Sequence, residues 1–481
     1  MKIPQEISQI IEKLQSANFE AFAVGGCVRD LLRNVKPKDW DIATSAKPNQ
    51  IQKIFPKSFY ENTFGTVTVQ TGSQDDSLKD VEITTYRVET EYSDKRHPDR
   101  VSFTENLKED LARRDFTINA MGLKPVDGKL EIVDPFNGQE DLNSKLIRAV
   151  GNPEERFSED ALRLLRAIRF AITLQLEIEK ETFAAIKKLA GNLARVSRER
   201  VRDELIKIVM SPDAEKGIYL LQESGLLEYI IPELVEGVGV EQNKHHVFTV
   251  FDHNVKSLGY SAKSNDPLHI RLAVLLHDVA KPRTKRGKSP DATFYGHDIV
   301  GASMTQKILT RLKFPNKIVD QAAHLVRNHL FVYDIGKVTE AGVRRLLKRV
   351  GKENFQDLLK LRMAERLGSG VPKARPYRLR HLEFMADKVS HDPLSTKMLK
   401  INGHDLIEKL KLTPGPKIGA IMDVLLAEVL KDPKKNTKSF LLEKAQKLID
   451  EDLSQLRNRA KDTVSEKEKE REEEIKKKYH V

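Results

Sequence analysis

The sequence predicts an α/β fold for the first 150 residues and a largely all-α fold for the rest. In the first part, short segments such as 66–69 and 81–85 alternate apolar and polar residues in the manner of strands. From Ser158 onward, apolar residues recur with the period of a helix almost everywhere. At 481 residues the chain is long enough for about three or four domains.

The elements of the first part follow in a simple order. Residues 7–14 predict an amphipathic helix, residues 19–24 a short apolar strand, and residues 28–32 the start of another helix. The strand leads into Gly25-Gly26. Paired glycines are most often a plain turn, but they also let the backbone approach a phosphate group closely.

The helical remainder divides by composition. Ser158 is the expected N-cap of a helix through Leu162 and Phe170, and residues 218–227 predict another helix that ends near Pro232. Residues 455–481 hold nine Lys/Arg and seven Asp/Glu, which predicts a solvated helix or disorder. We expect a head at 1–150, a neck at 151–235, a histidine-rich block at 236–350, a helical region at 351–450 with a connector at 371–380, and a charged tail at 451–481.

Composition restricts the partners and the compartment. The formal net charge of +11 favours a polyanionic partner, and nucleic acid is the obvious one. Cys27 is the only cysteine, so no intramolecular disulfide can form, which fits a reducing compartment. No apolar run approaches the roughly 20 residues of a membrane span. We expect a soluble cytoplasmic protein without a membrane partner; oligomeric state has no signal in the sequence.

Asp39 and Asp41 predict a metal site. On a strand, side chains at i and i+2 point to the same face, and carboxylates there suit Mg²⁺ bound to a nucleotide's phosphates. Glu82, expected on an adjacent strand, is the best-placed third carboxylate. The alternatives are a polar strand end for the aspartates and a cross-strand ion pair for Glu82.

A second polar segment lies near the end of the predicted head. Arg113 and Arg114 stand in a half-apolar setting that suits contact with a triphosphate, while Asp115 and Asn119 suit a ribose hydroxyl. Without other motifs, such a segment is usually an ion-pair cluster at the surface.

Five ordered motifs resemble those of bacterial-type CCA-adding enzymes and their poly(A) polymerase relatives, the class II branch of the polymerase-β-like nucleotidyltransferases. The motifs are Gly25-Gly26-x-x-Arg29-Asp30, Asp39-x-Asp41, and the segments 113–121, 157–171 and 195–205. The resemblance implies a polymerase-β-like mixed sheet, Mg²⁺ as cofactor, and template-independent addition of CCA from CTP and ATP to tRNA 3′ ends. It implies catalysis by Asp39, Asp41 and Glu82, and nucleotide binding by Gly25, Gly26, Arg29, Arg113, Arg114, Asp115, Asn119, Asp160, Arg163, Arg166 and Arg169.

Asp160 and Arg163 offer a physical basis for choosing the base. Residues three apart on a helix are neighbours, and this pair presents acceptors beside donors. Cytosine and adenine both carry an amino donor beside a ring-nitrogen acceptor, whereas guanine and uracil carry the reverse. The alternative is an ordinary helix salt bridge.

Residues 84–103 resemble a flexible loop that the family links to the final A addition. Because the loop looks complete, we favour a full CCA enzyme. A poly(A) polymerase and an A-adding tRNA nucleotidyltransferase remain alternatives that the motifs do not exclude.

The histidine-rich block resembles an HD domain, a metal-dependent phosphohydrolase type. The resemblance implies His253, His277, Asp278 and His297 as ligands of a second divalent metal, with His329, Asp334 and His246 less secure. It also implies phosphohydrolase activity. An alternative of another class is therefore an HD phosphohydrolase that acts on RNA ends and has a binding-only head. A third hypothesis is an RNA-binding scaffold.

Overall fold

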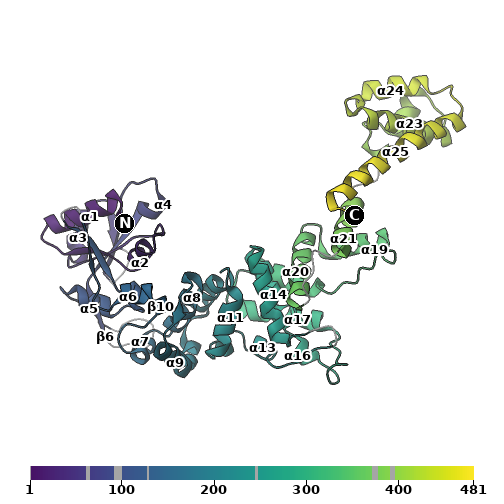
Figure 1. Ribbon diagram of the computed structural model, residues 1–481. Helices are drawn as coiled ribbons and strands as arrows, with labels where there is room; N and C mark the ends of the chain where they lie inside the picture. The colour runs from purple at the N-terminus through teal and green to yellow at the C-terminus, as the bar shows by residue number, and fades with distance from the viewer. Residues whose placement is uncertain are drawn as a thin grey trace. The chain divides into compact units, whose positions relative to one another are not determined.

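The computed structural model describes residues 2–60, 65–90, 100–126, 129–243, 247–370, 377–390 and 396–481. The chain forms two compact units (Figure 1). One comprises Met1–His329 with Lys360–Val371, and the other comprises Leu330–Leu359 with Pro372–Val481. Within the described part of the chain, no helix is both long and apolar enough to cross a membrane.

The head is built on a mixed sheet of seven strands, as the sequence predicts. Their order is β3-β4-β5-β2-β1-β8-β9, with β2 parallel to β5 and the other pairs antiparallel. The strands are β1 (Ala21–Val24), β2 (Asp41–Thr44), β3 (Ser58–Tyr60), β4 (Thr66–Gln70), β5 (Asp80–Thr85), β8 (Gly122–Val126) and β9 (Lys129–Val133). In a separate two-stranded sheet, β6 (Arg87–Thr90) pairs antiparallel with β7 (Arg100–Phe103).

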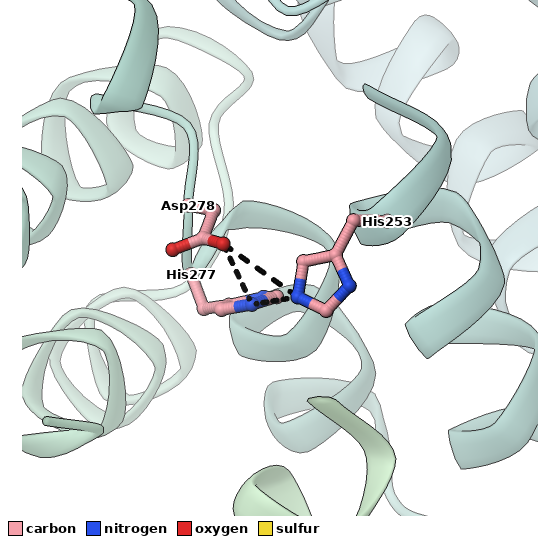
Figure 2. A group of neighbouring side chains, drawn as sticks. All are labelled: His253, His277 and Asp278. Atoms are coloured by element: carbon pink, nitrogen blue, oxygen red, sulfur yellow. Dashed lines mark hydrogen bonds and ion pairs between the residues drawn. The ribbon is translucent and has the colours of Figure 1, made fainter. Parts of the chain in front are cut away.

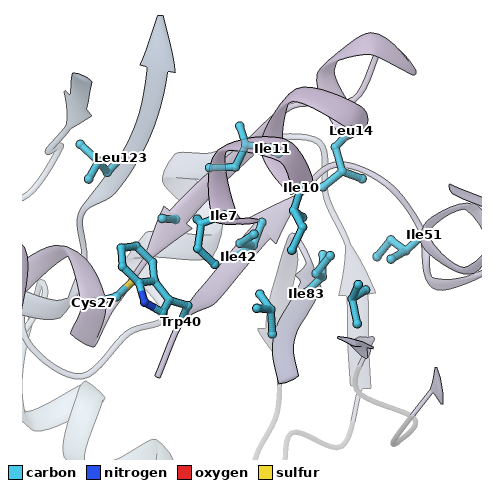
Figure 3. Packing of buried hydrophobic residues seen from close by; sticks show 14 of the residues in the cluster. Ile7, Ile10, Ile11, Leu14, Cys27, Trp40, Ile42, Ile51, Ile83 and Leu123 are labelled. Atoms are coloured by element: carbon cyan, nitrogen blue, oxygen red, sulfur yellow. The ribbon is translucent and has the colours of Figure 1, made fainter. Parts of the chain in front are cut away.

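Helices close the head around an apolar core. They are α1 (Gln5–Ser16), α2 (Gly26–Leu32), α3 (Pro48–Ile54), α4 (Asp76–Lys79), α5 (Leu107–Ala112) and α6 (Gly138–Asn143). Residues spaced three and four apart along α1, namely Ile7, Ile11 and Leu14, are fully buried against the sheet (Figure 3). Trp40 lies beside Cys27 in this core, which anchors the segment leading into β2.

The neck is helical, and its first helix differs from the expectation. Ser158 does not cap a long helix but lies inside α7 (Pro153–Glu159). The helical conformation is then interrupted at Asp160. The Oδ1 atom of Asp160 accepts from the backbone N–H of Leu162, where α8 begins. The neck helices are α8 (Leu162–Leu174), α9 (Lys180–Leu189), α10 (Arg198–Val209), α11 (Ala214–Glu223), α12 (Leu227–Ile230) and α13 (Pro232–Val235). The single helix expected at 218–227 is therefore divided between α11 and α12.

Two short strands, β10 (Leu146–Ile147) and β11 (Glu177–Ile178), pair in parallel and connect the end of the head to the neck. Further along, Arg271 connects the neck to the histidine-rich block. Its fully buried guanidinium donates to the carbonyls of Val209, Ser211 and Asp266. Because a buried cation needs such partners, this residue fixes α10 and the next helices as parts of one unit.

The histidine-rich block consists of α14 (Val250–Lys263), α15 (Leu268–Leu276), α16 (Lys281–Thr284), α17 (His297–Arg311) and α18 (Asn316–Asn328). The following helices are α19 (Glu340–Val350), α20 (Phe355–Gly368), α21 (Tyr377–Ser390), α22 (Gly403–Leu410), α23 (Pro416–Lys431), α24 (Lys438–Lys447) and α25 (Leu453–Tyr479). The charged tail is a helix, but it is not the fully solvated helix expected, because Leu456 is fully buried and the Tyr479 hydroxyl donates to Asp387 Oδ2 on α21. Most of the predicted connector at 371–380 lies outside the described residues.

Candidate functional site

The acidic pair lies where the chain enters the central strand β2. Asp41 is the first residue of β2, whereas Asp39 lies in a bend before it, so the two are not on one strand as predicted. The reason is Trp40, which is only 3% exposed and turns inward to the core. Both flanking carboxylates consequently lie toward the surface, Asp39 exposed and Asp41 partly buried.

Glu82 is brought beside this pair by strand register. In the parallel pairing of β2 with β5, Asp41 is the partner of Glu82. Laterally paired residues project on the same face of a sheet, and Glu82 is exposed there. The structure therefore places the three predicted carboxylates at one edge of the head.

Gly25 lies between the Asp41 carboxylate and the Arg114 guanidinium, close to both. A Cβ at Gly25 would lie 2.9 Å from Nη1 of Arg114 and 3.6 Å from Oδ2 of Asp41, and its φ of +80° is one that glycine adopts readily. Burial raises the pKa of the Asp41 carboxyl, the charge of Asp39 raises it further, and Arg114 opposes this. Two close acids with a desolvated member constitute a site that gains from a cation.

The two arginines are held by an acid that the sequence analysis did not identify. Fully buried Asp110 accepts from Arg113 Nε at 3.0 Å and lies 3.5 Å from Arg114 Nη2. Burial raises the pKa of Asp110, but the two arginines outweigh it and the net pKa is lowered. The signal was available, because acid and bases at i, i+3 and i+4 on a helix face one another.

A chain of hydrogen bonds joins the head to α8. Arg29 Nη1 donates to Asn119 Oδ1 at 2.7 Å, Asn119 Nδ2 donates to Asp115 Oδ1 at 3.1 Å, and Arg166 Nε donates to Asp115 Oδ2 at 2.7 Å. Arg29, Arg166 and Arg169 all lie over the ring of Phe170. The predicted nucleotide-binding residues on α2, on the segment after α5 and on α8 are thus brought together.

The side chains of Asp160 and Arg163 do not pair with each other, although the Arg163 N–H donates to the Asp160 carbonyl at 3.0 Å. Asp160 Oδ2 accepts from Arg200 Nη2 at 2.8 Å, while Arg163 Nη1 donates to Glu159 Oε2 at 2.7 Å. The helical-neighbour argument is wrong here, because the helix ends at Glu159 and restarts at Leu162. The interruption between α7 and α8 directs the two side chains to different partners.

A second cluster forms where four helices of the histidine-rich block meet. His253 Nε2 lies 3.1 Å from His277 Nε2 and 3.6 Å from Asp278 Oδ2 (Figure 2). The other carboxylate oxygen of Asp278 lies 3.3 Å from His297 Nε2 and 3.8 Å from His329 Nε2. The cluster contains two sets of potential metal ligands, His253–His277–Asp278 and Asp278–His297–His329. Within each set, the potential ligand atoms all lie within 4.8 Å of one another.

Three of these imidazoles are oriented by the backbone. Nδ1 of His277, His297 and His329 lies 2.7, 2.7 and 2.6 Å from the carbonyl oxygen three residues earlier. A carbonyl requires Nδ1–H, so Nε2 is left as the acceptor that faces Asp278. Metal-ligating histidines are commonly held in this way.

Protonation in the cluster is governed by burial and charge. Burial lowers the pKa of His253 to about 3 and that of His329 to about 4, which leaves both neutral near pH 7. Burial also lowers the pKa of His277, but the negative charge of Asp278 outweighs burial, and the net pKa of His277 is raised. His253 and His329, which stay neutral, form with the Asp278 carboxylate a donor set that fits a divalent transition metal.

Two further residues of the cluster were not predicted. Lys281 Nζ lies 2.6 Å from Asp278 Oδ2 and donates to Gln242 Oε1. Glu365 on α20 interacts electrostatically with His277 and His329; burial raises its pKa, but Arg362 and the histidines lower it to about 2. Glu365 comes from tertiary packing, which no spacing reveals, whereas Lys281 lies only three residues after Asp278 in the sequence.

Two less secure ligand predictions, Asp334 and His246, stay predictions. Asp334 pairs with Lys337 and Arg378, and it is absent from both described ligand sets. His246 lies outside the described residues.

Three family models match separate parts of the chain. Residues 21–148 match the "Poly A polymerase head domain", residues 175–237 match the "Probable RNA and SrmB- binding site of polymerase A", and residues 298–445 match "tRNA nucleotidyltransferase domain 2". His253, His277 and Asp278 lie between the second and third matches.

Relatives and solved structures agree over nearly the whole chain. The A-adding tRNA nucleotidyltransferase of Deinococcus radiodurans is 35% identical and covers 84% of this chain and 90% of its own. The CCA-adding enzyme of Ligilactobacillus salivarius is 31% identical, covering 93% and 98%. The Bacillus stearothermophilus CCA-adding enzyme, solved with CTP, is 28% identical with a TM-score of 0.58, covering 93% of this chain and 99% of its own. The chain therefore belongs to the family of tRNA nucleotidyltransferases that includes the CCA-adding and A-adding enzymes.

Proposed function

We propose that the chain adds CCA to the 3′ end of tRNA, without a template, from CTP and ATP. The observation that carries this proposal is that Asp39, Asp41 and Glu82 lie together where the inner strand β2 begins, beside Gly25 and Arg114. The similarity to full-length CCA-adding enzymes supports it. A nucleotidyl transfer of this kind, in the cytoplasm, fits the basic composition of the chain.

The carboxylates suit a hard cation. Asp41 is partly desolvated next to a second acid, an arrangement that a divalent cation relieves, and the oxygen donors favour Mg²⁺. When bound, Mg²⁺ neutralises triphosphate charge and activates the attacking hydroxyl. Asp39 and Asp41 would hold it, with Glu82 as the third carboxylate.

The surrounding groups would bind and orient the nucleotide. Gly25 and Gly26 leave the backbone open to phosphate, and Arg113 and Arg114 offer guanidinium donors that buried Asp110 preorganises. Asn119 and Asp115, tied to Arg29 and Arg166, would position the ribose.

Base selection would use Asp160 and Arg163, each after exchanging its partner. In this structure Arg200 occupies one oxygen of Asp160, and Glu159 occupies one guanidinium nitrogen of Arg163. Cytosine and adenine match a carboxylate acceptor beside a guanidinium donor. Guanine and uracil would leave buried groups unpaired, at a cost of about 1–3 kcal/mol each.

The test is product sequencing. Transcripts of tRNA lacking CCA, or ending in CC, are incubated with the purified chain, CTP, ATP and Mg²⁺. We expect CCA on the first and a single A on the second. Extension of only the CC transcript would make the chain an A-adding enzyme like its Deinococcus relative, long A tracts would make it a poly(A) polymerase, and no incorporation would refute the transferase proposal.

A second candidate function is phosphohydrolysis at the cluster of His253, His277, Asp278, His297 and His329. The backbone-oriented imidazoles around one buried carboxylate favour it, because such a set fits a divalent metal. When bound, the metal would supply a nucleophilic water. Metal content and hydrolysis of a 2′,3′-cyclic nucleotide, each measured for wild type and His277→Ala, test it. Equal metal content and activity in the two proteins would exclude the cluster.

A further inference from the structure

A basic hairpin lies between Asp278 and His297 in the chain and is ordered by its own backbone. Arg286 and Thr293 exchange two hydrogen bonds, each 2.9 Å from N to O. Gly287 lies in the turn with a φ of +77°, a conformation that suits glycine. We call residues 285–295 the basic hairpin.

The hairpin is fastened directly to the cluster. Its residue Phe294 is 8% exposed, and the Phe294 carbonyl accepts from Nδ1 of His297 at 2.7 Å. Nζ of Lys281 lies 5.5 Å from the centre of the Phe294 ring and 2.6 Å from Oδ2 of Asp278. The hairpin is therefore tied through Phe294 to His297 and, through Lys281, to the Asp278 carboxylate.

The outward side of the hairpin carries uncommitted cations and an aromatic ring. Arg286 and Lys288 are exposed, and within the described ranges neither forms an ion pair. Their neighbours differ: Arg283 is bound by Glu236, and Lys285 donates to the carbonyl of Glu241. Tyr295 is 79% exposed, which is unusual for a tyrosine next to a buried site.

This combination matches a single-stranded polynucleotide. Cations contact successive phosphates, and an exposed aromatic ring stacks on a base irrespective of its identity. A free mononucleotide has no upstream phosphate for Arg286 and Lys288 to hold. The exposed groups thus favour a polymer over a nucleotide.

We propose that the basic hairpin binds the RNA strand next to its 3′ terminus and presents that terminus to the His/Asp cluster, so that the substrate class of the cluster is an RNA end. The inference rests on the proposed phosphohydrolase function. For a 2′,3′-cyclic phosphate, one water adds across one P–O bond; the phosphorus gains the water oxygen and the released ribose oxygen takes a proton.

The first experiment compares polymer with monomer on the full chain. Hydrolysis of a 2′,3′-cyclic mononucleotide is measured beside that of an oligoribonucleotide ending in the same group. We expect R286Q/K288Q to raise KM for the oligonucleotide about tenfold without changing mononucleotide hydrolysis. K307Q/K317Q, two exposed lysines outside the hairpin, is the control with equal charge loss. An equal loss on both substrates would overturn the proposal.

The second experiment does not depend on hydrolysis. An oligoribonucleotide with 4-thiouridine next to its 3′ end is photo-cross-linked to the full chain, and the modified peptides are mapped. Cross-links within 285–295 that weaken in R286Q/K288Q and in Y295A support the hairpin. Cross-links confined to the head and neck would overturn it. If wild type hydrolyses neither substrate, the phosphohydrolase function fails, while the cross-link map still decides where RNA binds.

Discussion

The two candidate centres of this chain solve the problem of holding a cation in opposite ways. At the head, the acids lie where the inner strand β2 begins, with Asp39 exposed and Asp41 partly buried. In the His/Asp cluster, His253, His277 and Asp278 are at most 2% exposed. The open site is made of oxygen donors and the closed one is mainly of nitrogen donors.

The difference indicates different relations between metal and substrate. An open carboxylate site suits a cation that arrives with a triphosphate and leaves with pyrophosphate, and hard oxygen donors fit Mg²⁺. A closed, backbone-oriented imidazole set suits a resident metal, because the ligands are arranged before binding. The two centres should therefore respond independently to mutation and to chelators.

The largest expected effect is that of Asp41→Ala on nucleotide addition. Removing the carboxylate that faces both Glu82 and Arg114 should lower the rate of incorporation by on the order of 10³-fold or more. The measurement is single-turnover incorporation of CMP and AMP into tRNA transcripts. Metal content and cyclic-nucleotide hydrolysis should stay at the wild-type level.

The matched change at the head is Asp30→Ala. It removes a nearby acid that pairs with Arg29 and does not belong to the group of Asp39, Asp41 and Glu82. It should reduce addition much less than Asp41→Ala does. If the Asp41→Ala variant adds nucleotides at the wild-type rate, the metal site lies elsewhere.

His277→Ala is the reciprocal experiment. His277 contacts both His253 and Asp278, so its loss should weaken metal retention by more than about 100-fold. Metal content after dialysis, measured by mass spectrometry, checks this. Addition of CCA should change by less than about twofold; a parallel loss of both activities would show that the two centres are coupled.

Base choice should be affected less than catalysis. With Asp160→Ala, the acceptor proposed to read the amino groups of C and A is removed. Discrimination against UTP and GTP should fall by about 100-fold, because one or two unpaired groups no longer penalise them. Competition between nucleotides in single-addition assays measures the ratio.

Two further variants distinguish a role of Asp160 in choosing the base from a role in holding the neck together. Asp203→Ala removes an exposed acid of the same helical region that pairs with Arg202, and it should leave discrimination unchanged. Arg200→Lys keeps a cation near Asp160. If Asp160→Ala slows incorporation of all four nucleotides equally, Asp160 supports the neck and does not read the base.

The sequence predicted those parts of the two sites that depend on local pattern. The order strand, Gly25-Gly26, helix is found as expected, because apolar alternation and a glycine turn act over a few residues. The expected ligands His253, His277, Asp278 and His297 converge as well. An apolar helix ending in His277-Asp278 leaves these side chains where helices meet.

Features decided by tertiary packing were missed. Burial of Trp40 moves Asp39 off the strand, and the break at Asp160 gives Asp160 and Arg163 separate partners. Glu365 joins the cluster from α20, and neither spacing nor composition indicates that approach. Helical period predicts which face is buried but not which helix covers it.

The smallest expected effect concerns stability, and it compares the acid that joins head to neck with an ordinary surface acid. Burial raises the pKa of Asp115, but Arg166 and Asn119 lower it to about 2, against an unfolded value near 3.9. The stabilisation is therefore complete above about pH 4 and is lost as pH falls through 2. Asp115→Asn should cost about 2 kcal/mol of unfolding free energy at pH 7, measured by urea denaturation, and the deficit should shrink below pH 4. Exposed Glu140→Gln should cost less than about 0.5 kcal/mol. A deficit for Asp115→Asn that did not change with pH would mean that shape, and not the Asp115–Arg166 charge pair, holds α8 to the head.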